Sequence, residues 1–302
     1  MTEPDEGGYV GRFAPSPTGP LHFGSLLAGV VSFLEARRAR GLWLLRIEDI
    51  DPPREQAGAA DAIVRCLEDY GFEWDGDILM QSASRSAHDE AIEQLVNSGL
   101  AYRCNCSRRM LASVPTGSLG TIYPGTCRER EVLGEAAIRV RTNDSPIAFN
   151  DRFQGPLEQR LETESGDFVI RRRDGLVAYQ LAVVVDDALN GVTDVVRGLD
   201  LLDSTPRQIY LQRLLNLPTP SYAHLPIAVH ADGQKLSKLT GAPPIRSDRA
   251  AATLCQALDA LGQSPPPDLS AGSVREVWAW AESNWDPDRI IGRRNIAVQH
   301  YS

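Results

Sequence analysis

Lysine is almost absent from this 302-residue sequence, although 31 of its residues are basic. The two lysines, Lys235 and Lys238, lie in one segment, Lys-Leu-Ser-Lys-Leu, and every other basic residue is arginine. Lysine is a compact charge on a flexible stem, whereas arginine is a planar fork. We therefore expect the lysine segment to be a loop with a specialised task, such as following the charge of a moving phosphate.

Long apolar runs are also missing: no stretch of 18 apolar residues occurs, so we expect no membrane-spanning helix. The first eight residues are acidic and polar, which does not fit a signal or transit peptide, and a cytoplasmic protein is expected. A net charge of −9 argues against a protein that coats nucleic acid nonspecifically. Local arginine clusters, such as residues 171–173, still leave room for one RNA-binding face.

Three of the five cysteines, Cys104, Cys106 and Cys127, fall within 24 residues. In a reducing compartment such a cluster suggests a metal before a disulfide. Tetrahedral zinc needs a fourth ligand, and no histidine lies nearby in the sequence. Tyr123 is the first candidate and Glu129 the alternative. The zinc would be structural, and three reduced thiols without metal are the competing interpretation.

The first 50 residues predict a strand at residues 9–13, a loop rich in proline and glycine, a helix at 25–40 and a strand at 42–47. This is a βαβ unit of the doubly wound α/β class, whose ligands bind at the carboxyl ends of the strands. Further helical and buried-strand patterns follow along the chain. The expected strands are 176–185, 195–196 and 225–229, and the expected helices are 55–70, 84–98, 204–215, 250–261 and 273–283.

The composition changes between residues 101 and 165, which hold the cysteine cluster and short mixed segments. We therefore expect a Rossmann-type parallel sheet domain formed by residues 1–100 and 166–240. Residues 101–165 would be a zinc-binding insertion, and residues 241–302 a short helical C-terminal region.

A phosphate site is expected where the first strand leads into the first helix. A helix N-terminus offers unpaired N–H groups and a positive dipole. Gly19 and Gly24 would let a nucleotide approach the backbone, and His22 would hydrogen-bond a phosphate. A histidine that only caps the helix is the simpler alternative.

Residues 12–25, Arg-Phe-Ala-Pro-Ser-Pro-Thr-Gly-Pro-Leu-His-Phe-Gly-Ser, together with the lysine segment, resemble the paired "HIGH" and "KMSKS" signatures of class I aminoacyl-tRNA synthetases. The glutamyl and glutaminyl branch is the most similar. The resemblance implies ATP as a substrate with Mg²⁺, and His22 and Lys238 as the catalytic residues. The implied ATP-binding residues are Gly19, His22, Gly24, Ser25, Lys235, Ser237 and Lys238. Ser25 and Leu239 depart from the usual histidine and serine of the two signatures.

The same resemblance implies a glutamate pocket formed by Arg12, Phe13, Ala14, Pro15, Ser16, Glu48, Tyr179 and Arg197. Arginine chelates carboxylates bidentately, and an acid such as Glu48 suits the ammonium group. Arg46 and Asp49 compete for these roles. Tyr179 is expected to start a strand ending at residue 187, and Val183 in that strand replaces an asparagine typical of the branch, which predicts weaker glutamate binding.

The chain ends soon after the lysine segment, without room for the usual anticodon-binding domain. This length, with the Cys-x-Cys…Tyr-x-x-x-Cys insertion, resembles the glutamyl-Q tRNA(Asp) synthetases. The resemblance implies a monomer that activates L-glutamate with ATP without needing tRNA. It would then transfer the glutamate to queuosine in the anticodon of tRNA(Asp). The alternatives are a truncated glutamyl-tRNA synthetase that charges a 3′ end, and a non-catalytic tRNA-binding relative.

Overall fold

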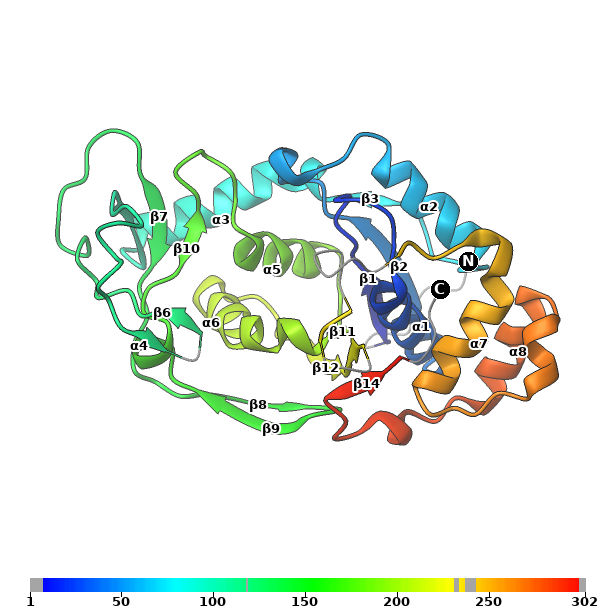
Figure 1. Ribbon diagram of the computed structural model, residues 1–302. Coiled ribbons are helices and arrows are strands. Elements are labelled where there is room, and N and C mark those ends of the chain that lie inside the picture. The colour runs from blue at the N-terminus through cyan, green and yellow to red at the C-terminus, as the bar shows by residue number, and fades with distance from the viewer. Residues whose placement is uncertain (1–7, 118, 231–233, 237–242, 299–302) are drawn as a thin grey trace.

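The computed structural model describes residues 8–117, 119–230, 234–236 and 243–298 (Figure 1). Its centre is a set of parallel strands in the order β1-β2-β3, with bounds Val10–Phe13, Leu42–Ile47 and Leu79–Met80. Strand β11 (Asp194–Gly198) pairs in parallel with β12 (Ser221–Leu225). The backbone N–H of Thr193, just before β11, donates to the Val10 carbonyl at 2.9 Å and joins the two groups of strands. The parallel α/β architecture expected from the sequence is confirmed.

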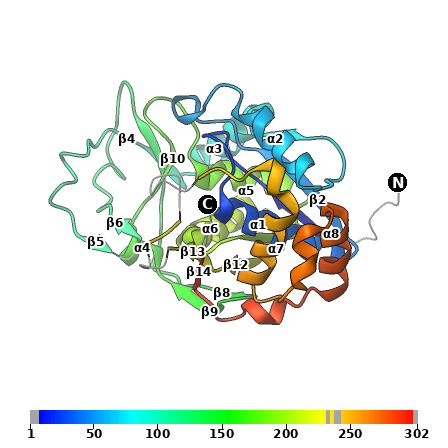
Figure 2. The ribbon, with the colours of Figure 1, turned by 45° about the vertical axis from the view of Figure 1, so that its right-hand side comes forward.

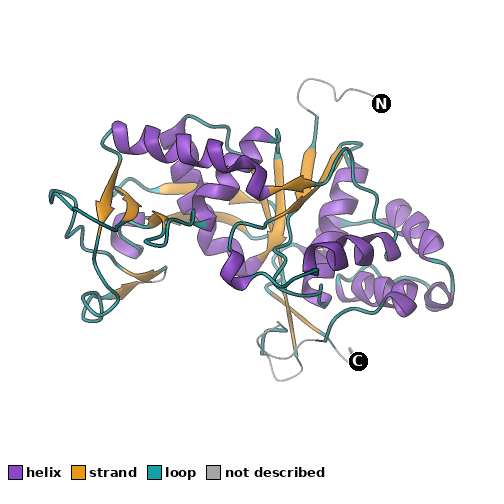
Figure 3. Cartoon of the chain, turned by 90° about the horizontal axis from the view of Figure 1, so that it is seen from above, coloured by secondary structure: helices purple, strands orange, loops and turns teal. Residues whose placement is uncertain are grey.

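Side chains that alternate along β2 enter different hydrophobic cores on the two faces of the strands. Trp43 and Leu45 pack into a core shared with α1 (Phe23–Arg38) and α2 (Ala59–Asp69). Leu44 packs against a second core formed with α3 (Arg85–Asn97) and α6 (Thr205–Leu215). Strands point successive side chains to opposite faces, so helices must cover both (Figure 3). Helices on both faces of a parallel sheet are the arrangement of a doubly wound α/β fold.

The segment Tyr179–Leu189 is a helix, α5, and not the strand expected from its run of valines. β-branched residues favour strands only weakly, and burial against neighbouring elements overrides that preference. Residues 181–187 of α5 are all buried, and the helix packs against α3 and α6. Val183, at 1% exposure, is therefore a helix residue and not a strand position.

Residues 101–171 form a lobe, called the insertion lobe below, with an antiparallel sheet of order β10-β7-β4 (Figure 1). These strands span Val169–Arg171, Ala137–Val140 and Ala101–Cys104. Strand β10 lies beyond residue 165, the expected end of the insertion. A long hairpin of β8 (Ile147–Asp151) and β9 (Gly155–Gln159) runs from this lobe back toward the central strands. The shorter elements of the lobe are β5 (Thr116–Gly117), β6 (Gly120–Thr121) and α4 (Leu161–Glu164).

After the lysine segment, α7 (Ala250–Ala260) and α8 (Val274–Asn284) pack beside α1 (Figure 2). Both helices match the expected ranges closely. The expected strand at 225–229 is interrupted at Pro226, so that β12 is followed by a separate β13 (Ile227–Val229). The sequence did not predict β14 (Asn295–Ala297), which pairs in parallel with β13.

Short 3-10 turns connect several of these elements. They span Pro52–Arg54, Gln81–Ser84, Leu199–Ser204, Ser247–Arg249, Pro267–Ala271 and Pro287–Ile290. Within the described part of the chain, no helix is both long enough and apolar enough to span a membrane.

Candidate active site

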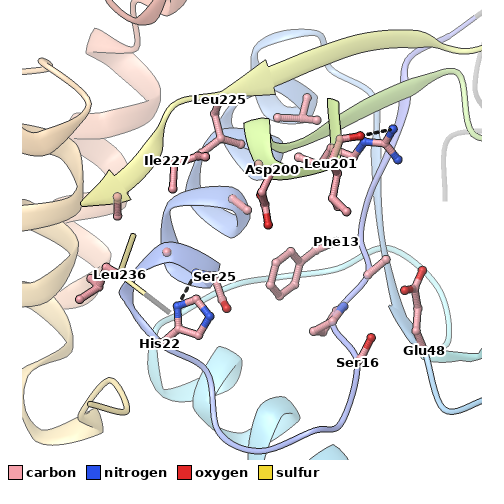
Figure 4. A pocket seen from close by; sticks show the side chains of 18 of the residues that line it. Phe13, Ser16, His22, Ser25, Glu48, Asp200, Leu201, Leu225, Ile227 and Leu236 are labelled. Atoms are coloured by element: carbon pink, nitrogen blue, oxygen red, sulfur yellow. Dashed lines mark hydrogen bonds between the residues drawn. The ribbon is translucent and has the colours of Figure 1, made fainter. Parts of the chain in front are cut away.

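A cavity of about 550 Å³ opens at the carboxyl ends of β1, β2 and β11 (Figure 4). Figure 4 shows His22 and Leu236 at one end and Glu48 at the other, with Phe13 between them. The cavity lining includes most of the residues predicted from the sequence: Arg12, Phe13, Ala14, Pro15, Ser16, His22, Gly24, Ser25, Glu48, Tyr179, Arg197 and Lys235. Gly19 is not part of the lining, and Ser237, Lys238 and Leu239 lie outside the described residues.

A buried ionic network supports the end of the cavity that contains Arg12. Asp187 on α5 accepts from Nε of Arg12 at 3.2 Å and from a terminal nitrogen of Arg46 at 2.6 Å. Burial alone would raise the pKa of Asp187, but the two guanidinium groups hold it below its usual value. Asp187 is therefore ionised, and its negative charge fixes both arginines.

Glu48 lies at the end of β2 and faces the cavity, and its side chain is 8% exposed. Burial raises the pKa of Glu48 to about 6, although Arg46 and Arg12 act in the opposite direction. Arg46 is 3.6 Å from Glu48 but is not among the lining residues, so it supports the site from behind. Asp49 accepts hydrogen bonds from the backbone and hydroxyl of Ser82, at 2.8 and 2.6 Å, and also lies outside the lining.

Arg197 on β11 is 4% exposed and is held from three sides. Its Nε donates to Nε2 of His224 at 2.9 Å, and one terminal nitrogen donates to Oγ1 of Thr205 at 2.7 Å. The same nitrogen donates to the Leu201 carbonyl at 3.3 Å. The other terminal nitrogen is 3.4 Å from the hydroxyl of Tyr179, a second lining residue. Tyr179 stays protonated, because burial raises its pKa.

At the opposite end, the N-terminus of α1 points into the cavity. His22 caps this helix, since its Nδ1 accepts the backbone N–H of Ser25 at 3.3 Å (Figure 4). The first turn carries no acidic residue, so no side chain of that turn offsets the positive end of the helix dipole. A Cβ on Gly24 would lie 3.1 Å from the His22 ring, so glycine keeps room for the cap. The capping role proposed as the alternative for His22 is thus present.

Lys235 approaches the cavity beside the helix terminus. Its Nζ donates to Oδ2 of Asp200 at 2.7 Å, and both side chains are more than 40% exposed. The next residue, Leu236, is 3% exposed and its backbone N–H donates to the Ala228 carbonyl at 2.8 Å. Leu236 therefore anchors the start of the lysine segment in the core, while the charge of Lys235 stays near water.

Sequence reasoning missed the residues that support the predicted ones: Asp187, Asp200, Thr205 and His224. The only local signal was the pair of acids that ends the apolar run at 181–187. Asp187 meets its partners across 175 and 141 residues of chain, so spacing in the sequence could not reveal the contacts.

The cysteine cluster lies in the insertion, away from the cavity. The sulfur atoms of Cys104, Cys106 and Cys127 lie within 4.8 Å of one another, as required of three ligands to one metal ion. The Tyr123 hydroxyl is 3.3 Å from Sγ of Cys104 and 3.5 Å from Sγ of Cys106. Glu129, by contrast, has a side chain that is 84% exposed and pairs with Arg141 at 2.8 Å.

Electrostatics at the cluster favour a thiolate at Cys104, whereas burial raises the pKa of the Cys106 thiol. Burial raises the pKa of the Cys104 thiol, but hydrogen bonds with Tyr123 and from Arg139 bring it below its usual value overall. Metal ligation requires thiolates, so the donor set of the cluster fits a soft divalent cation.

A second cavity of about 290 Å³ adjoins the first and shares Ser16, Glu48, Arg54 and Tyr179 with it. Arg172, which follows β10 of the insertion sheet, also lines this side cavity. The side cavity therefore extends from the main cavity toward the insertion lobe.

Comparison with known proteins identifies the family of the chain. Residues 9–243 match the family described as tRNA synthetases class I (E and Q), catalytic domain. The glutamyl-Q tRNA(Asp) synthetase of Ectopseudomonas mendocina is 54% identical over 290 residues, which cover 96% of this chain and 97% of the relative. That of Pseudomonas aeruginosa is 55% identical over 283 residues, covering 93% and 95%.

A solved structure gives the same fold. The glutamate-tRNA synthetase of Elizabethkingia anophelis superposes with a TM-score of 0.79 at 24% identity, over 96% of this chain and 68% of that chain. The solved structure shows the fold, and the family model and the sequence relatives show the family. The chain belongs to the class I tRNA synthetases and, within them, to the glutamyl-Q tRNA(Asp) synthetase family.

Proposed function

We propose that the protein activates L-glutamate with ATP and transfers it to queuosine in the anticodon of tRNA(Asp). The observation that carries this proposal is the charge pattern of the cavity. Arg12, Arg197 and Glu48 line the same space as the N-terminus of α1, and Arg54 and Asp200 also line this cavity. Glutamate has two carboxylates and one ammonium group, and the helix terminus suits the phosphates of a nucleotide.

In the proposed activation step, Arg12 and Arg197 bind the carboxylates and Glu48 binds the ammonium group. A carboxylate oxygen attacks the α-phosphorus of ATP, the bond to the bridging oxygen breaks, and pyrophosphate leaves with Mg²⁺. The α1 N-terminus, His22 and Lys235 stabilise the charge that develops on the phosphates. Lys238 would contribute from the segment outside the described residues.

In the proposed transfer step, a hydroxyl of queuosine attacks the carbonyl of glutamyl-adenylate and AMP leaves. The side cavity next to Ser16, Glu48 and Tyr179 offers a route for the modified base to reach the adenylate. Because that route extends toward the insertion, we propose that the insertion lobe lies near the anticodon stem.

Two measurements test the proposal. Purified protein should catalyse glutamate-dependent exchange between ATP and pyrophosphate without RNA, and glutamine, which lacks the second carboxylate, should give little exchange. Radiolabelled glutamate should then appear on tRNA(Asp) that contains queuosine, but not on queuosine-free tRNA(Asp). Label on tRNA(Glu) would instead support a truncated glutamyl-tRNA synthetase, and absence of exchange would exclude the enzymatic proposal.

We also propose that Cys104, Cys106, Cys127 and Tyr123 hold one structural Zn²⁺ ion. When bound, the ion would cross-link the loops of the insertion. Four protein ligands would leave no open position for chemistry. Metal analysis should find about one zinc per chain. Cys104→Ser should lower this content, whereas Cys255→Ser, in a buried helix outside the cluster, should not. Equal zinc content in the two variants would contradict the assignment.

A further inference from the structure

A buried aspartate–histidine pair lies directly behind Arg197. Asp151 ends strand β8 of the insertion hairpin and is 1% exposed, and His224 on β12 is 0% exposed. His224 lies opposite Arg197 in the parallel register of β11 and β12. Two segments that are far apart in the sequence therefore meet at the base of the cavity.

The hydrogen bonds of Asp151 decide where the histidine carries its proton. Its Oδ1 accepts the backbone N–H groups of Phe153, Gln154 and His224 at 3.0, 2.9 and 3.1 Å. Its Oδ2 is 2.5 Å from Nδ1 of His224. Burial alone would raise the pKa of Asp151, but these bonds keep it below its usual value. An ionised Asp151 accepts only, so Nδ1 must be the protonated nitrogen.

The other ring nitrogen, Nε2, is then an acceptor that faces Arg197. Burial, assisted by the nearby charge of Arg197, lowers the pKa of His224 to about 4, so the ring is neutral near pH 7. Nε2 accepts from Nε of Arg197 at 2.9 Å and lies 3.1 Å from Oγ1 of Thr205. The Thr205 Oγ1 in turn accepts a hydrogen bond from a terminal nitrogen of Arg197, so the three side chains form one contact group.

We propose that His224, set in one tautomer by Asp151, is a positioning residue that orients the Arg197 guanidinium toward glutamate. The hydrogen bonds to His224, Thr205 and Leu201 occupy Nε and one terminal nitrogen of the guanidinium. The remaining nitrogen is next to Tyr179 at the cavity wall. A guanidinium fixed in this way offers that remaining nitrogen to a carboxylate without first losing rotational freedom. This inference rests on the proposed function, because glutamate is the ligand of Arg197 there.

The same contacts tie glutamate binding to the insertion. The tip of the β8–β9 hairpin docks on β12 through the backbone N–H of Arg152, which donates to the Tyr222 carbonyl at 2.9 Å. Gln154 adds bonds to the carbonyls of His224 and Arg293, at 2.8 and 3.0 Å. Several hydrogen bonds thus hold the hairpin that carries Asp151 in place. Asp151 contacts His224, and His224 contacts Arg197, so the position of the hairpin affects the orientation of Arg197.

Two amide substitutions of His224 separate its two hydrogen bonds. In His224→Asn the amide reaches the place of Nδ1, so it keeps the Asp151 contact and loses the acceptor for Arg197. In His224→Gln the amide oxygen reaches the place of Nε2, so the acceptor is kept and the Asp151 contact is lost. The dissociation constant of L-glutamate, measured by calorimetry, should rise roughly tenfold or more in His224→Asn, the loss expected for a hydrogen bond to a charged group. It should rise only about threefold or less in His224→Gln.

His88→Asn is the matched control. His88 is also fully buried and lies 2.8 Å from an aspartate, Asp186, but it has no contact with Arg197. This control should lose thermal stability without a change in glutamate affinity. Equal glutamate affinities in His224→Asn and His224→Gln would overturn the inference.

A ¹⁵N spectrum of the histidines provides a readout that does not depend on catalysis. His224 should show a protonated Nδ1 and an unprotonated Nε2 between pH 6 and 8, and Asp151→Asn should shift the proton to Nε2. The opposite tautomer in the wild type would overturn the inference. Failure of the proposed function is distinguishable, because the wild type would then give no pyrophosphate exchange while the tautomer could still be read.

Discussion

The two ends of the cavity differ in how their charge is held. At the end proposed for glutamate, Arg12, Glu48 and Arg197 are 4 to 9% exposed and are held by other buried side chains. At the end proposed for phosphates, a helix N-terminus is joined by Lys235, whose side chain is 44% exposed. One end is a fixed network, and the other combines backbone dipoles with a lysine that water can reach.

This difference has an energetic consequence. Removing one partner of a buried ion pair typically costs 3–5 kcal/mol, because the other charge is left uncompensated. An exposed pair is worth about 0–1 kcal/mol. Substitutions at the glutamate end should therefore change binding and stability together. Those at the phosphate end should change the reaction and leave stability nearly unaffected.

The largest effect is expected for Arg12→Met, which removes an ion-pair partner of buried Asp187. Pyrophosphate exchange should fall by at least about 100-fold, and the free energy of unfolding in urea should fall by about 3 kcal/mol. Arg128→Met is the control, because Arg128 pairs with buried Asp167 at 2.6 Å in the insertion. It should destabilise the protein and spare exchange. Full stability of Arg12→Met would contradict the picture of a fixed network.

An intermediate effect is expected from pH. The pKa of Glu48 is raised from 4.5 to about 6, so the carboxyl is neutral in the free protein below pH 6. A neutral carboxyl does not attract ammonium, so the glutamate dissociation constant should rise about tenfold per pH unit below 6. The contribution of Glu48 to folding stability changes with pH in the opposite direction to glutamate affinity. Because the folded protein holds this proton more tightly than the unfolded chain, the contribution of Glu48 to stability is present below pH 4.5 and lost as pH rises through 6.

Glu48→Gln tests this assignment, since it removes the titrating group and keeps the shape. The variant should bind glutamate weakly, with little dependence on pH between 5 and 7. A wild-type affinity that does not change between pH 5 and 7 would show that Glu48 does not bind the ammonium group.

The smallest effect is expected for Lys235→Met at the phosphate end. Exchange should fall by only a few-fold, mainly through a higher KM for ATP, and the free energy of unfolding should stay within about 0.5 kcal/mol. Lys235→Arg should recover most of the activity, because the partner Asp200 is exposed and accepts either cation. A loss of stability comparable to that of Arg12→Met would remove the distinction between the two ends.

Local patterns in the sequence predicted the elements that depend on neighbouring residues. The strand at 42–47 and the helices α7 and α8 lie within about a residue of their expected bounds, since apolar spacing and the stop at Gly41 are local signals. The valine run at 179–187 was misread, because a helix buried on most sides has no polar face to reveal its period.

The residues that line the cavity were predicted better than the buried residues that hold them in position. Arg12, Glu48 and Arg197 were found through the motifs around them and the resemblance they carry. Asp151, Asp187 and His224 carry no local motif. The pairs that Asp151 forms with His224 and Asp187 forms with Arg46 and Arg12 span 73, 141 and 175 residues. Contacts of that kind follow from the packing of the chain and not from spacing within it.

The pairing of β14 with β13 joins the last described strand to the one that leads into the lysine segment. A fragment that stops before Arg294 would expose the edge of β13, and an open edge recruits strands from other molecules. Such a fragment should therefore aggregate even though α7 and α8 are intact. The amide of Ile227, which donates to the Arg294 carbonyl at 2.9 Å, would report the opening of this edge by hydrogen exchange.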